Sequence, residues 1–231
     1  MILCVLRALC GKLLWVLIMI ILVFATEVEA RPFIDYHDLR KQDKREFYDL
    51  YEGGNISLVI TGMGSMKGAF SLSDLIQEET NRGNSIAKII NYGIAGSLSD
   101  KFSIGAVVEM DKVIKYDPVE FSRPKPGKLF LSSFPDIIVN EERGGLNILA
   151  TSDHPIFTKE DSERVAKYAT FVDMEGYGYA FVSTHYGIPI RLFKGISDFA
   201  FKHSEESFKQ NVKTCLEKLL SFHKSSSFLE E

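Results

Sequence analysis

Two segments near the C-terminus constrain the fold of this chain more than any other part of its sequence. Residues 171–176 (Phe-Val-Asp-Met-Glu-Gly) place a carboxylate just before a predicted helix, and residues 191–198 (Arg-Leu-Phe-Lys-Gly-Ile-Ser-Asp) form an apolar strand that ends in another carboxylate. The stretch between them, 177–189, is long enough for one crossover helix. A strand–helix–strand unit would bring both acids to the same edge of a parallel sheet, which is where open α/β sheets bind their ligands.

The rest of the chain continues the alternation of strands and helices. Apolar runs predict strands at 19–25, 55–61, 86–92, 105–116, 146–151, 171–172 and 188–196. Helical spacing of apolar residues predicts helices at 66–80, 158–168, 176–186 and 204–223, and glycines predict turns at 62–65 and 93–96. The charged stretch 40–51 is predicted to be a loop or a short helix, and the proline-rich stretch 117–135 a loop. This order predicts the α/β class, as a three-layer α/β/α domain with a central mixed sheet.

Composition argues against several kinds of partner. At 231 residues, one domain is the simplest organisation. The formal net charge is −4 and charges of both signs are mixed along the chain, so no basic stripe predicts nucleic-acid binding. The three cysteines and five histidines show no spacing typical of disulfide frameworks or metal sites. We therefore expect no metal, no cofactor and no nucleic-acid partner.

The N-terminal apolar run has two interpretations. Residues 13–25 are almost purely apolar, basic residues precede them, and Val28-Glu29-Ala30 resembles a small-x-small cleavage site. This pattern is typical of a signal peptide or a short membrane anchor. The part from Met19 to Ala25 also fits a buried parallel strand, because such strands are continuous Ile/Leu/Val runs. The absence of a disulfide pattern favours the cytosol.

Six short segments together carry a resemblance to a known family. They are Phe24-Ala25 with Glu29-Ala30-Arg31-Pro32, Thr61-Gly62-Met63-Gly64, Asn91-Tyr92-Gly93-Ile94-Ala95-Gly96, Ile104-Gly105-Ala106-Val107-Val108, Val172-Asp173-Met174-Glu175 and Ile196-Ser197-Asp198. In this order, over nearly the whole chain, they resemble the purine nucleoside phosphorylase / methylthioadenosine–S-adenosylhomocysteine nucleosidase superfamily. The Glu-Ala-Arg-Pro sequence and the glycine turn with Ile94 resemble the branch that contains futalosine and aminodeoxyfutalosine hydrolases.

The resemblance changes the interpretation of the N-terminus. It implies that Glu29 lies at the end of the first strand, in the active site, so that cleavage after Ala30 would remove both. We therefore favour the strand. The expected organisation is an N-terminal apolar extension or misassigned start (1–18), a nucleosidase domain (19–224) and a polar tail (225–231). This organisation predicts a cytoplasmic protein; export or membrane anchoring through residues 1–30 is the alternative, with membrane contact expected only if the run is kept as an anchor.

The resemblance also implies different roles for three acids. Breaking an N-ribosidic bond requires a proton for the departing purine and negative charge near the sugar, which gains oxocarbenium character. Asp198 is implied as the general acid, which must be protonated at neutral pH, a state favoured by burial or by a purine partner. Glu29 is implied as the base that activates water, and Glu175 as the acceptor of hydrogen bonds from ribose hydroxyls, with Met174 against the sugar. From the sequence alone, Asp198 and Glu175 are also compatible with ordinary acids at helix starts, and Glu29 with a solvated charge.

Further substrate contacts are implied at Ser197, Gly64, Ile94, Ala95, Gly96, Asp173 and Ile156. The base-binding loop departs from the family, because Pro155 stands where nucleosidases of the methylthioadenosine type have a phenylalanine that stacks on the purine. Ring stacking must then come from elsewhere, with Phe157 and Phe199 as candidates. His154 is a candidate for substrate contact, although a loop histidine satisfied by its own hydrogen bonds is commoner.

Water, rather than phosphate, is the expected nucleophile. Phosphate binding needs cationic or multiple N–H donors, yet Asn91 stands where phosphorylases of the superfamily carry an arginine, and Ile94 where serine is frequent. The resemblance therefore implies a hydrolase for a 5′-modified purine nucleoside: aminodeoxyfutalosine, favoured by the Ile94 turn, methylthioadenosine or adenosylhomocysteine. It also implies a homodimer. The alternatives are a phosphorylase, an exported or membrane-tethered nucleoside-binding protein without catalysis, and a dinucleotide-binding oxidoreductase.

Overall fold

The computed structural model describes residues 4–9, 12–43, 45–116, 135–140, 144–200 and 205–227. Its strands are β1 (Cys4–Leu9), β2 (Lys12–Phe24), β3 (Arg40–Lys41), β4 (Asp49–Gly53), β5 (Ile56–Ile60), β6 (Ser85–Ser97), β7 (Val107–Glu109), β8 (Lys112–Lys115), β9 (Ile137–Ile138), β10 (Ile148–Thr151), β11 (Phe171–Asp173) and β12 (Ile190–Phe199). Its helices are α1 (Glu27–His37), α2 (Ser65–Asn81), α3 (Lys159–Val165), α4 (Gly176–Tyr186) and α5 (Glu205–Ser225).

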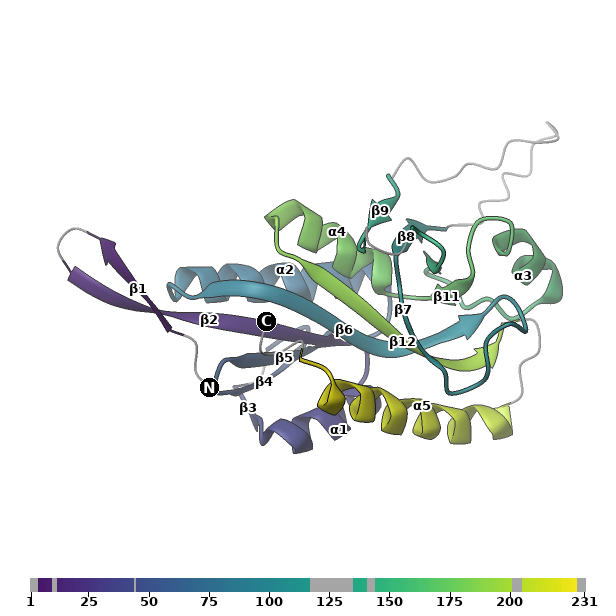
Figure 1. The fold of residues 1–231 in the computed structure, drawn as a ribbon, viewed down its shortest axis with the longest axis horizontal. Helices are drawn as coiled ribbons and strands as arrows, with labels where there is room; N and C mark the ends of the chain where they lie inside the picture. The colour runs from purple at the N-terminus through teal and green to yellow at the C-terminus, as the bar shows by residue number, and fades with distance from the viewer. Residues whose placement is uncertain are drawn as a thin grey trace.

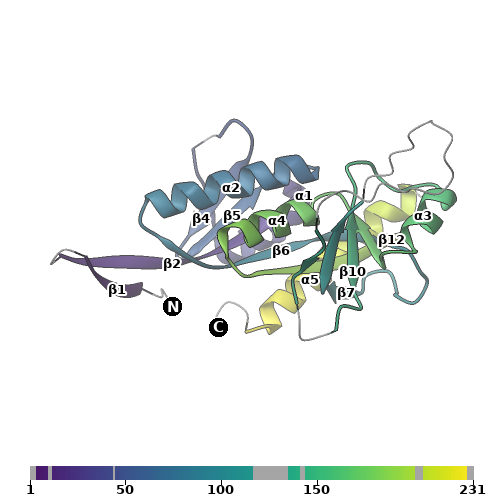
Figure 2. The ribbon, with the colours of Figure 1, turned by 90° about the horizontal axis from the view of Figure 1, so that it is seen from above.

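A mixed sheet forms the middle layer of the molecule. Its strand order is β3-β4-β5-β2-β6-β11-β10-β8-β9, with β12 paired to β6 and β7, and β1 paired to β2. Helices α2 and α4 cover one face of this sheet and helices α1 and α5 the other (Figure 1). Figure 2, seen from above, shows α2 and α4 lying over the strands. The predicted three-layer α/β/α architecture with a mixed sheet is confirmed.

Strand β2 lies at the centre of the sheet, between β5 and β6, and runs parallel to both. Its alternate residues face opposite helical layers: Leu22 and Phe24 pack in the core that includes α1 and α5, and Ile21 in the core that includes α2 and α4. Burial on both faces explains the uninterrupted apolar sequence. The predicted strand is confirmed, but it begins before Met19, at Lys12, and its first half pairs with β1 as an antiparallel hairpin (Figure 1). Within the described ranges, no helix combines the length and the apolar character needed to cross a bilayer.

Two segments fold differently from their predictions. The stretch 40–51 is a loop in its described middle part, 42–43 and 45–48, but its ends form β3 and the start of β4, because Leu50 and Tyr51 are buried and β4 pairs antiparallel with β5. The predicted strand 105–116 divides into β7 and β8, because β7 pairs with β12 whereas β8 pairs with β10. In both cases the choice of strand partner overrides the local sequence. The predicted loop 117–135 lies, apart from its last residue, outside the described residues.

The predicted glycine turn at 93–96 is part of a strand. It continues β6, which pairs with β12 along most of its length. A Cβ atom added at Gly93 would lie 3.2 Å from Oε1 of Glu29, and one added at Gly96 would lie 3.1 Å from Oδ1 of Asp198. The glycines are therefore explained by the close approach of two acidic side chains to the strand, and not by a turn.

The C-terminal strand–helix–strand unit also differs from its prediction. Strand β11 runs antiparallel to β6 and β12 runs parallel to it, so the two strands are not parallel neighbours. Strand β11 pairs with β6 at only two positions, so its direction is set mainly by the segments that connect it to the rest of the chain. Strand β11 begins beside the C-terminal end of β6, where Phe171 pairs with Ser97, and then runs back along β6. Glu175 and Asp198 nevertheless reach the same end of β6, where both line one cavity.

Polar contacts join helices α1 and α5 to each other and to the sheet. His37 Nε2 in α1 lies 2.7 Å from His223 Nε2 in α5, and His223 Nδ1 lies 2.8 Å from the hydroxyl of Tyr92 in β6. Burial lowers the pKa of His223 to about 4, so this imidazole is neutral at physiological pH.

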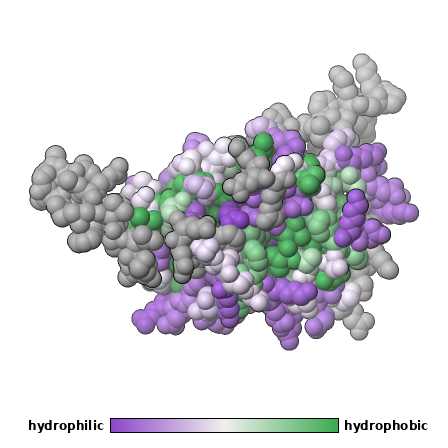
Figure 3. Space-filling view, in the orientation of Figure 1, coloured by the Kyte–Doolittle hydropathy of each residue, from purple (hydrophilic) through white to green (hydrophobic). Residues whose placement is uncertain are grey.

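Hydrophilic side chains predominate along the lower edge of the molecule, where α1 and α5 lie (Figure 3).

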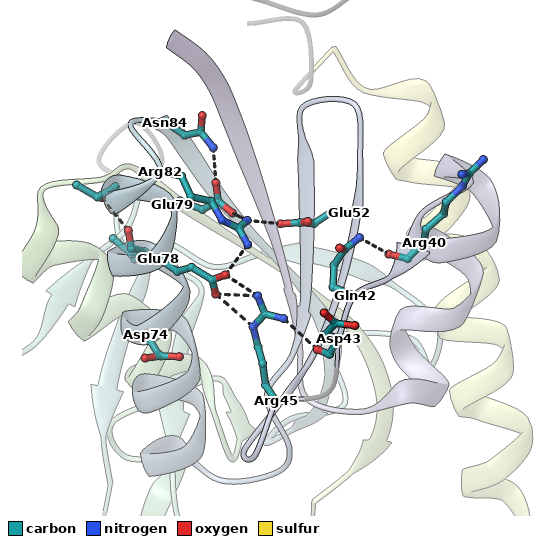
Figure 4. A network of polar contacts seen from close by, with 12 residues as sticks. Arg40, Gln42, Asp43, Arg45, Glu52, Asp74, Glu78, Glu79, Arg82 and Asn84 are labelled. Carbon is teal, nitrogen blue, oxygen red and sulfur yellow. Dashed lines mark hydrogen bonds and ion pairs between the residues drawn. The ribbon is translucent and has the colours of Figure 1, made fainter.

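Ion pairs fasten the C-terminal end of α2 to the sheet (Figure 4). Arg82 pairs with Glu52 of β4 and with Glu79, both at 2.9 Å, and Arg45 lies 2.6 Å from Glu78. The side chain of Glu79 is only 1% exposed, and burial raises its pKa. The positive charge of Arg82 therefore offsets the negative charge of the Glu79 carboxylate, which has almost no access to water.

Replacing Arg82 with methionine is expected to lower the free energy of unfolding by about 1–3 kcal/mol, because a buried carboxylate loses its cation. The raised pKa of Glu79 means that the folded state favours the protonated carboxyl over the carboxylate. The loss of stability caused by Arg82→Met should therefore shrink as the pH falls and Glu79 is protonated. Urea denaturation at about pH 8 and about pH 5 measures both effects. The exposed Arg40→Met is the matched control, and equal losses for the two variants would contradict the role of Arg82.

Candidate active site

The carboxyl ends of β2, β6, β11 and β12 border a cavity of about 820 Å³. Small-molecule sites usually measure roughly 300–1,000 Å³. The cavity is lined by Ala25, Thr26, Val28, Glu29, Met63, Ile94, Ala95, Gly96, His154, Pro155, Ile156, Phe157, Val172, Asp173, Met174, Glu175, Ser197, Asp198, Phe208, Lys209 and Val212. Apart from Gly64 and the stacking candidate Phe199, the predicted site residues are all on this wall. The cavity wall therefore brings together residues from seven separate parts of the sequence.

Glu29 is held in a fixed orientation at the start of α1. Thr26 caps this helix, and its backbone N–H and its hydroxyl both donate to Oε2 of Glu29 at 2.9 Å. The other oxygen, Oε1, accepts a hydrogen bond from the N–H of Ile94 at 3.2 Å. The expectation that Glu29 ends the first strand is wrong: β2 stops at Phe24, and the cap at Thr26 places the acid in the first helical turn. Its carboxylate still borders the cavity.

Glu175 occupies the N-cap position of α4 and contacts the start of α2. Its Oε1 accepts a hydrogen bond of 2.8 Å from the N–H of Gly64, which has a φ of 102° that favours glycine. Gly64 thus acts on the site through Glu175 and is not on the cavity wall. Burial, and after it the charge of Asp173, raise the pKa of Glu175 to about 7. At neutral pH this group is therefore present as both carboxyl and carboxylate, and either form can bind a hydroxyl.

Replacing Glu175 with glutamine is expected to stabilise the protein at alkaline pH. The raised pKa means that folding favours the protonated form; this contribution is complete below the ordinary glutamate pKa and is lost as the pH rises through about 7. The uncharged Glu175→Gln should therefore exceed the wild type in free energy of unfolding by roughly 1–3 kcal/mol at about pH 8.5 and match it near about pH 5. Urea titrations at both pH values measure this, with the exposed Glu217→Gln as control. A wild type more stable than the variant at alkaline pH would refute the expectation.

A buried ion pair lies beside Glu175. Nζ of Lys194 is 2.9 Å from Oδ2 of Asp173, and neither side chain is more than 2% exposed. Asp173 also accepts hydrogen bonds from the hydroxyl of Thr151 at 2.6 Å and from the N–H of Gly176 at 2.9 Å. Asp173 borders the cavity as expected, but both its oxygens have partners within the protein, so we infer that it positions the loop before α4. Sequence reasoning misses Lys194, although a lysine inside an apolar strand is itself a signal of a paired buried charge.

Asp198 lies near the end of β12, half-buried in the cavity wall. The pairing of β12 with β6 is irregular between Ile196 and Asp198. A bulge of this kind explains why two successive residues, Ser197 and Asp198, both line the cavity. The hydroxyl of Ser197 donates to Oδ2 of Asp198 at 2.7 Å. Asp198 is thus a strand residue and not a helix cap, and it shares one cavity with Glu29 and Glu175.

The predicted base-binding loop forms a continuous part of the wall, residues 154–157. Asp153 fastens this loop, because its Oδ1 accepts a hydrogen bond of 2.7 Å from the hydroxyl of Ser65 at the start of α2. Of the two aromatic candidates for stacking, Phe157 lines the cavity, whereas Phe199 is not among the described residues that line it. Phe157 is therefore the better placed of the two rings.

Helix α5 contributes cavity residues that sequence reasoning does not anticipate. They are Phe208, Lys209 and Val212, and the other unanticipated wall residues are Ala25, Thr26, Val28, Met63 and Val172. The position of α5 depends on its packing against β12, where the side chain of Asn211 donates to the carbonyl of Ser197 at 2.9 Å. The amphipathic spacing of this helix predicts that it packs on the sheet, but not which of its residues reach the site.

Comparison with known proteins agrees with the resemblance carried by the motifs. The sequence profile of the Phosphorylase superfamily matches residues 19–138. A 5′-methylthioadenosine/S-adenosylhomocysteine nucleosidase from Arabidopsis thaliana is 25% identical over 224 residues, covering 87% of each chain. An aminodeoxyfutalosine nucleosidase from Helicobacter pylori is 28% identical over 161 residues, covering 63% of this chain and 67% of that protein.

Solved structures share the fold. The futalosine hydrolase of Helicobacter pylori strain 26695 matches with a TM-score of 0.75 at 20% identity, covering 90% of this chain and 96% of that one. The 5′-methylthioadenosine/S-adenosylhomocysteine nucleosidase of Helicobacter pylori, solved with butyl-thio-DADMe-Immucillin-A, matches with a TM-score of 0.74 at 21% identity, covering 90% and 97%. Because the family profile spans more than half of the chain and the fold agrees with it, this protein belongs to the phosphorylase superfamily.

Proposed function

We propose that the protein is a nucleosidase that hydrolyses the N-ribosidic bond of a 5′-modified purine nucleoside, releasing the free base and the modified ribose. One observation carries this proposal: Asp198, Glu29 and Glu175 converge on a single cavity large enough for a nucleoside. The names of the relatives supply the substrate class, which comprises methylthioadenosine, adenosylhomocysteine and aminodeoxyfutalosine.

Asp198 is the proposed general acid. Its Oδ2 accepts the hydroxyl of Ser197 at 2.7 Å, which leaves Oδ1 for a ring nitrogen of the purine. As the bond between C1′ and the base breaks, its electron pair moves to the purine, and the proton of Asp198 neutralises the charge that develops there.

Glu29 and Glu175 are the proposed partners of the water and the sugar. Three hydrogen bonds hold the Glu29 carboxylate, two from Thr26 and one from Ile94, so it can accept a proton from water in one defined geometry. The water oxygen then bonds to C1′ as the base leaves. Glu175 binds the ribose hydroxyls, and its negative form stabilises the oxocarbenium character of the sugar.

The charges on the wall favour water over phosphate as nucleophile. Among the described lining residues, Lys209 is the sole lysine or arginine, whereas Glu29, Asp173, Glu175 and Asp198 are acids. A phosphate dianion would be repelled by these carboxylates and would lack an arginine fork to bind it.

A panel of purine nucleosides tests the function directly. The full chain is incubated with methylthioadenosine, adenosylhomocysteine, aminodeoxyfutalosine and adenosine, with and without inorganic phosphate, and the free base is measured. We expect release of base without phosphate from at least one of the 5′-modified nucleosides. A strict requirement for phosphate would identify a phosphorylase, and binding without release of base would identify a nucleoside-binding protein.

Replacing Phe157 with alanine is expected to raise KM about tenfold with a smaller effect on kcat, because stacking of an aromatic ring on a base contributes about 1–3 kcal/mol to binding. Steady-state rates of base release measure this effect. The exposed Phe181 of α4, which does not line the cavity, provides the matched control Phe181→Ala. Similar KM values for Phe157→Ala and the wild type would show that another group stacks on the base.

We also propose that the protein is a homodimer. Met63, Met66 and Phe70 are 64%, 83% and 51% exposed at and beyond the start of α2, and the ring of Phe47 lies 5.2 Å from that of Phe70. Neighbouring exposed apolar side chains of this kind are typical of interaction surfaces. Light scattering of the purified protein should give twice the chain mass, and Met66→Glu should shift it towards the monomer. A monomeric wild type would contradict the proposal.

The proposed catalytic domain spans residues 19–224 and is proposed to act in the cytoplasm. The reason is that cleavage after Ala30 would remove both β2, at the centre of the sheet, and Glu29, on the cavity wall. Mass spectrometry of the native protein tests this organisation. A mature chain that begins at Arg31 would lack both features and would contradict it.

A further inference from the structure

The charged groups of the cavity wall differ in how far they are exposed to solvent. Glu29 and Glu175 are only 6% and 8% exposed, and the side chain of Asp173 is 1% exposed. Lys209, near the start of α5, is an exposed residue on the same wall. A purine and ribose that engage the deep acids occupy the floor of the cavity, so the 5′ substituent is the part of the substrate that reaches the rim.

The rim combines apolar side chains with Lys209, which is the one lysine or arginine among the described residues that line the cavity. Val28 lines the cavity and is 65% exposed, and Phe208 and Val212 adjoin Lys209 on α5 and line the same wall. The ammonium group of Lys209 has no hydrogen bond or ion pair within the described part of the chain. It is therefore available to a ligand group that lies at the mouth of the cavity.

We propose that Lys209 is a specificity residue that favours 5′ substituents in which a short apolar spacer ends in a carboxylate. The inference rests on the proposed nucleosidase function and narrows its substrate class. The apolar rim would contact the spacer, and Lys209 would pair with the carboxylate. The acids of the floor repel a substrate carboxylate, so a negative group is accommodated at the rim and not deeper in the cavity.

Two matched substrates isolate this contact. They are 5′-deoxy-5′-(2-carboxyethylthio)adenosine and its methyl ester, which differ mainly in charge, and methylthioadenosine serves as the test of nucleosidase activity itself. The ratio of kcat/KM for the acid to that for the ester is measured for the wild type, Lys209→Met and Lys213→Met. Lys213 lies one turn further along α5, is exposed and does not line the cavity, so its variant makes the same change of charge away from the site.

We expect Lys209→Met to lower the acid-to-ester ratio by about three- to fivefold, the effect of losing one solvent-accessible ion pair, and Lys213→Met to leave it unchanged. The preference of the wild type for the acid should weaken as salt is added, because the pair is screened. An unchanged ratio in Lys209→Met, or equal reductions in the two variants, would overturn the role of Lys209 while base release continues. If the wild type releases adenine from none of the three substrates, the nucleosidase proposal fails, and the inference fails with it.

Discussion

Replacing Asp198 with asparagine is expected to slow the release of base by about 10²–10⁴-fold, the usual contribution of a positioned general acid. Asparagine has nearly the same shape, and its side-chain oxygen can still accept the hydroxyl of Ser197, which lies 2.7 Å from Asp198 Oδ2. It cannot transfer a proton to the purine. The loss should therefore appear mainly in kcat, whereas KM changes little, because the groups that hold the sugar are intact.

The experiment needs evidence that the fold is unchanged. The urea midpoint of Asp198→Asn should stay close to that of the wild type, since the substitution removes no packing contact in the core. Asp100→Asn makes the same chemical change at an exposed position that does not line the cavity and should keep full activity. A near-normal rate in Asp198→Asn would exclude this residue as the acid.

The largest effect on stability is expected from Lys194. Lys194→Met should lower the free energy of unfolding by about 3–5 kcal/mol, because it leaves the carboxylate of Asp173 buried without its cation. The two side chains are 2% and 1% exposed, so water cannot replace the lost partner. Net stabilities of domains are about 5–15 kcal/mol, so the variant is expected to be close to unfolding at physiological temperature. Urea denaturation measures the change.

A second substitution separates the loss of the cation from the loss of packing. The double variant Lys194→Met with Asp173→Asn removes both charges, and it should recover a large part of the lost stability, because replacing both partners of a buried pair costs much less than removing one. The amide oxygen introduced by Asp173→Asn can still accept the hydroxyl of Thr151, which donates to Asp173 at 2.6 Å in the wild type. If the double variant is no more stable than Lys194→Met, the pair is not the source of the effect.

Much of the fold follows from local patterns in the sequence. The continuous apolar run that ends at Phe24 predicts a strand buried on both faces, and Ile21 and Leu22 do face the two different cores. The helix at Gly176–Tyr186 is predicted with the bounds that the structure shows. These elements are strongly patterned, so their burial can be inferred without knowing what they pack against.

The elements that are mispredicted depend on their partners. At the ends of the charged sequence 40–51, β4 begins because β5 offers an edge for antiparallel pairing, and β3 then pairs with β4. The glycines at 93–96 indicate a turn when considered alone, whereas the structure shows that they make room for Glu29 and Asp198. Neither the partner strand nor the neighbouring acid is visible in the local sequence, so these positions could not be assigned from it.

The sequence by itself determined the class of fold and the burial of the strongly patterned strands and helices. It also indicated that Glu175 and Asp198 lie at one edge of the sheet. These properties depend on the period of apolar residues and on the position of charges along the chain. Only the tertiary structure decided that Lys194 pairs with Asp173, that Thr26 turns Glu29 into the cavity through a helix cap, and that Lys209 reaches the rim. The physical reason is that the partner, burial and geometry of a charged side chain are set by the packing of segments that lie far apart in the chain, which no local pattern records.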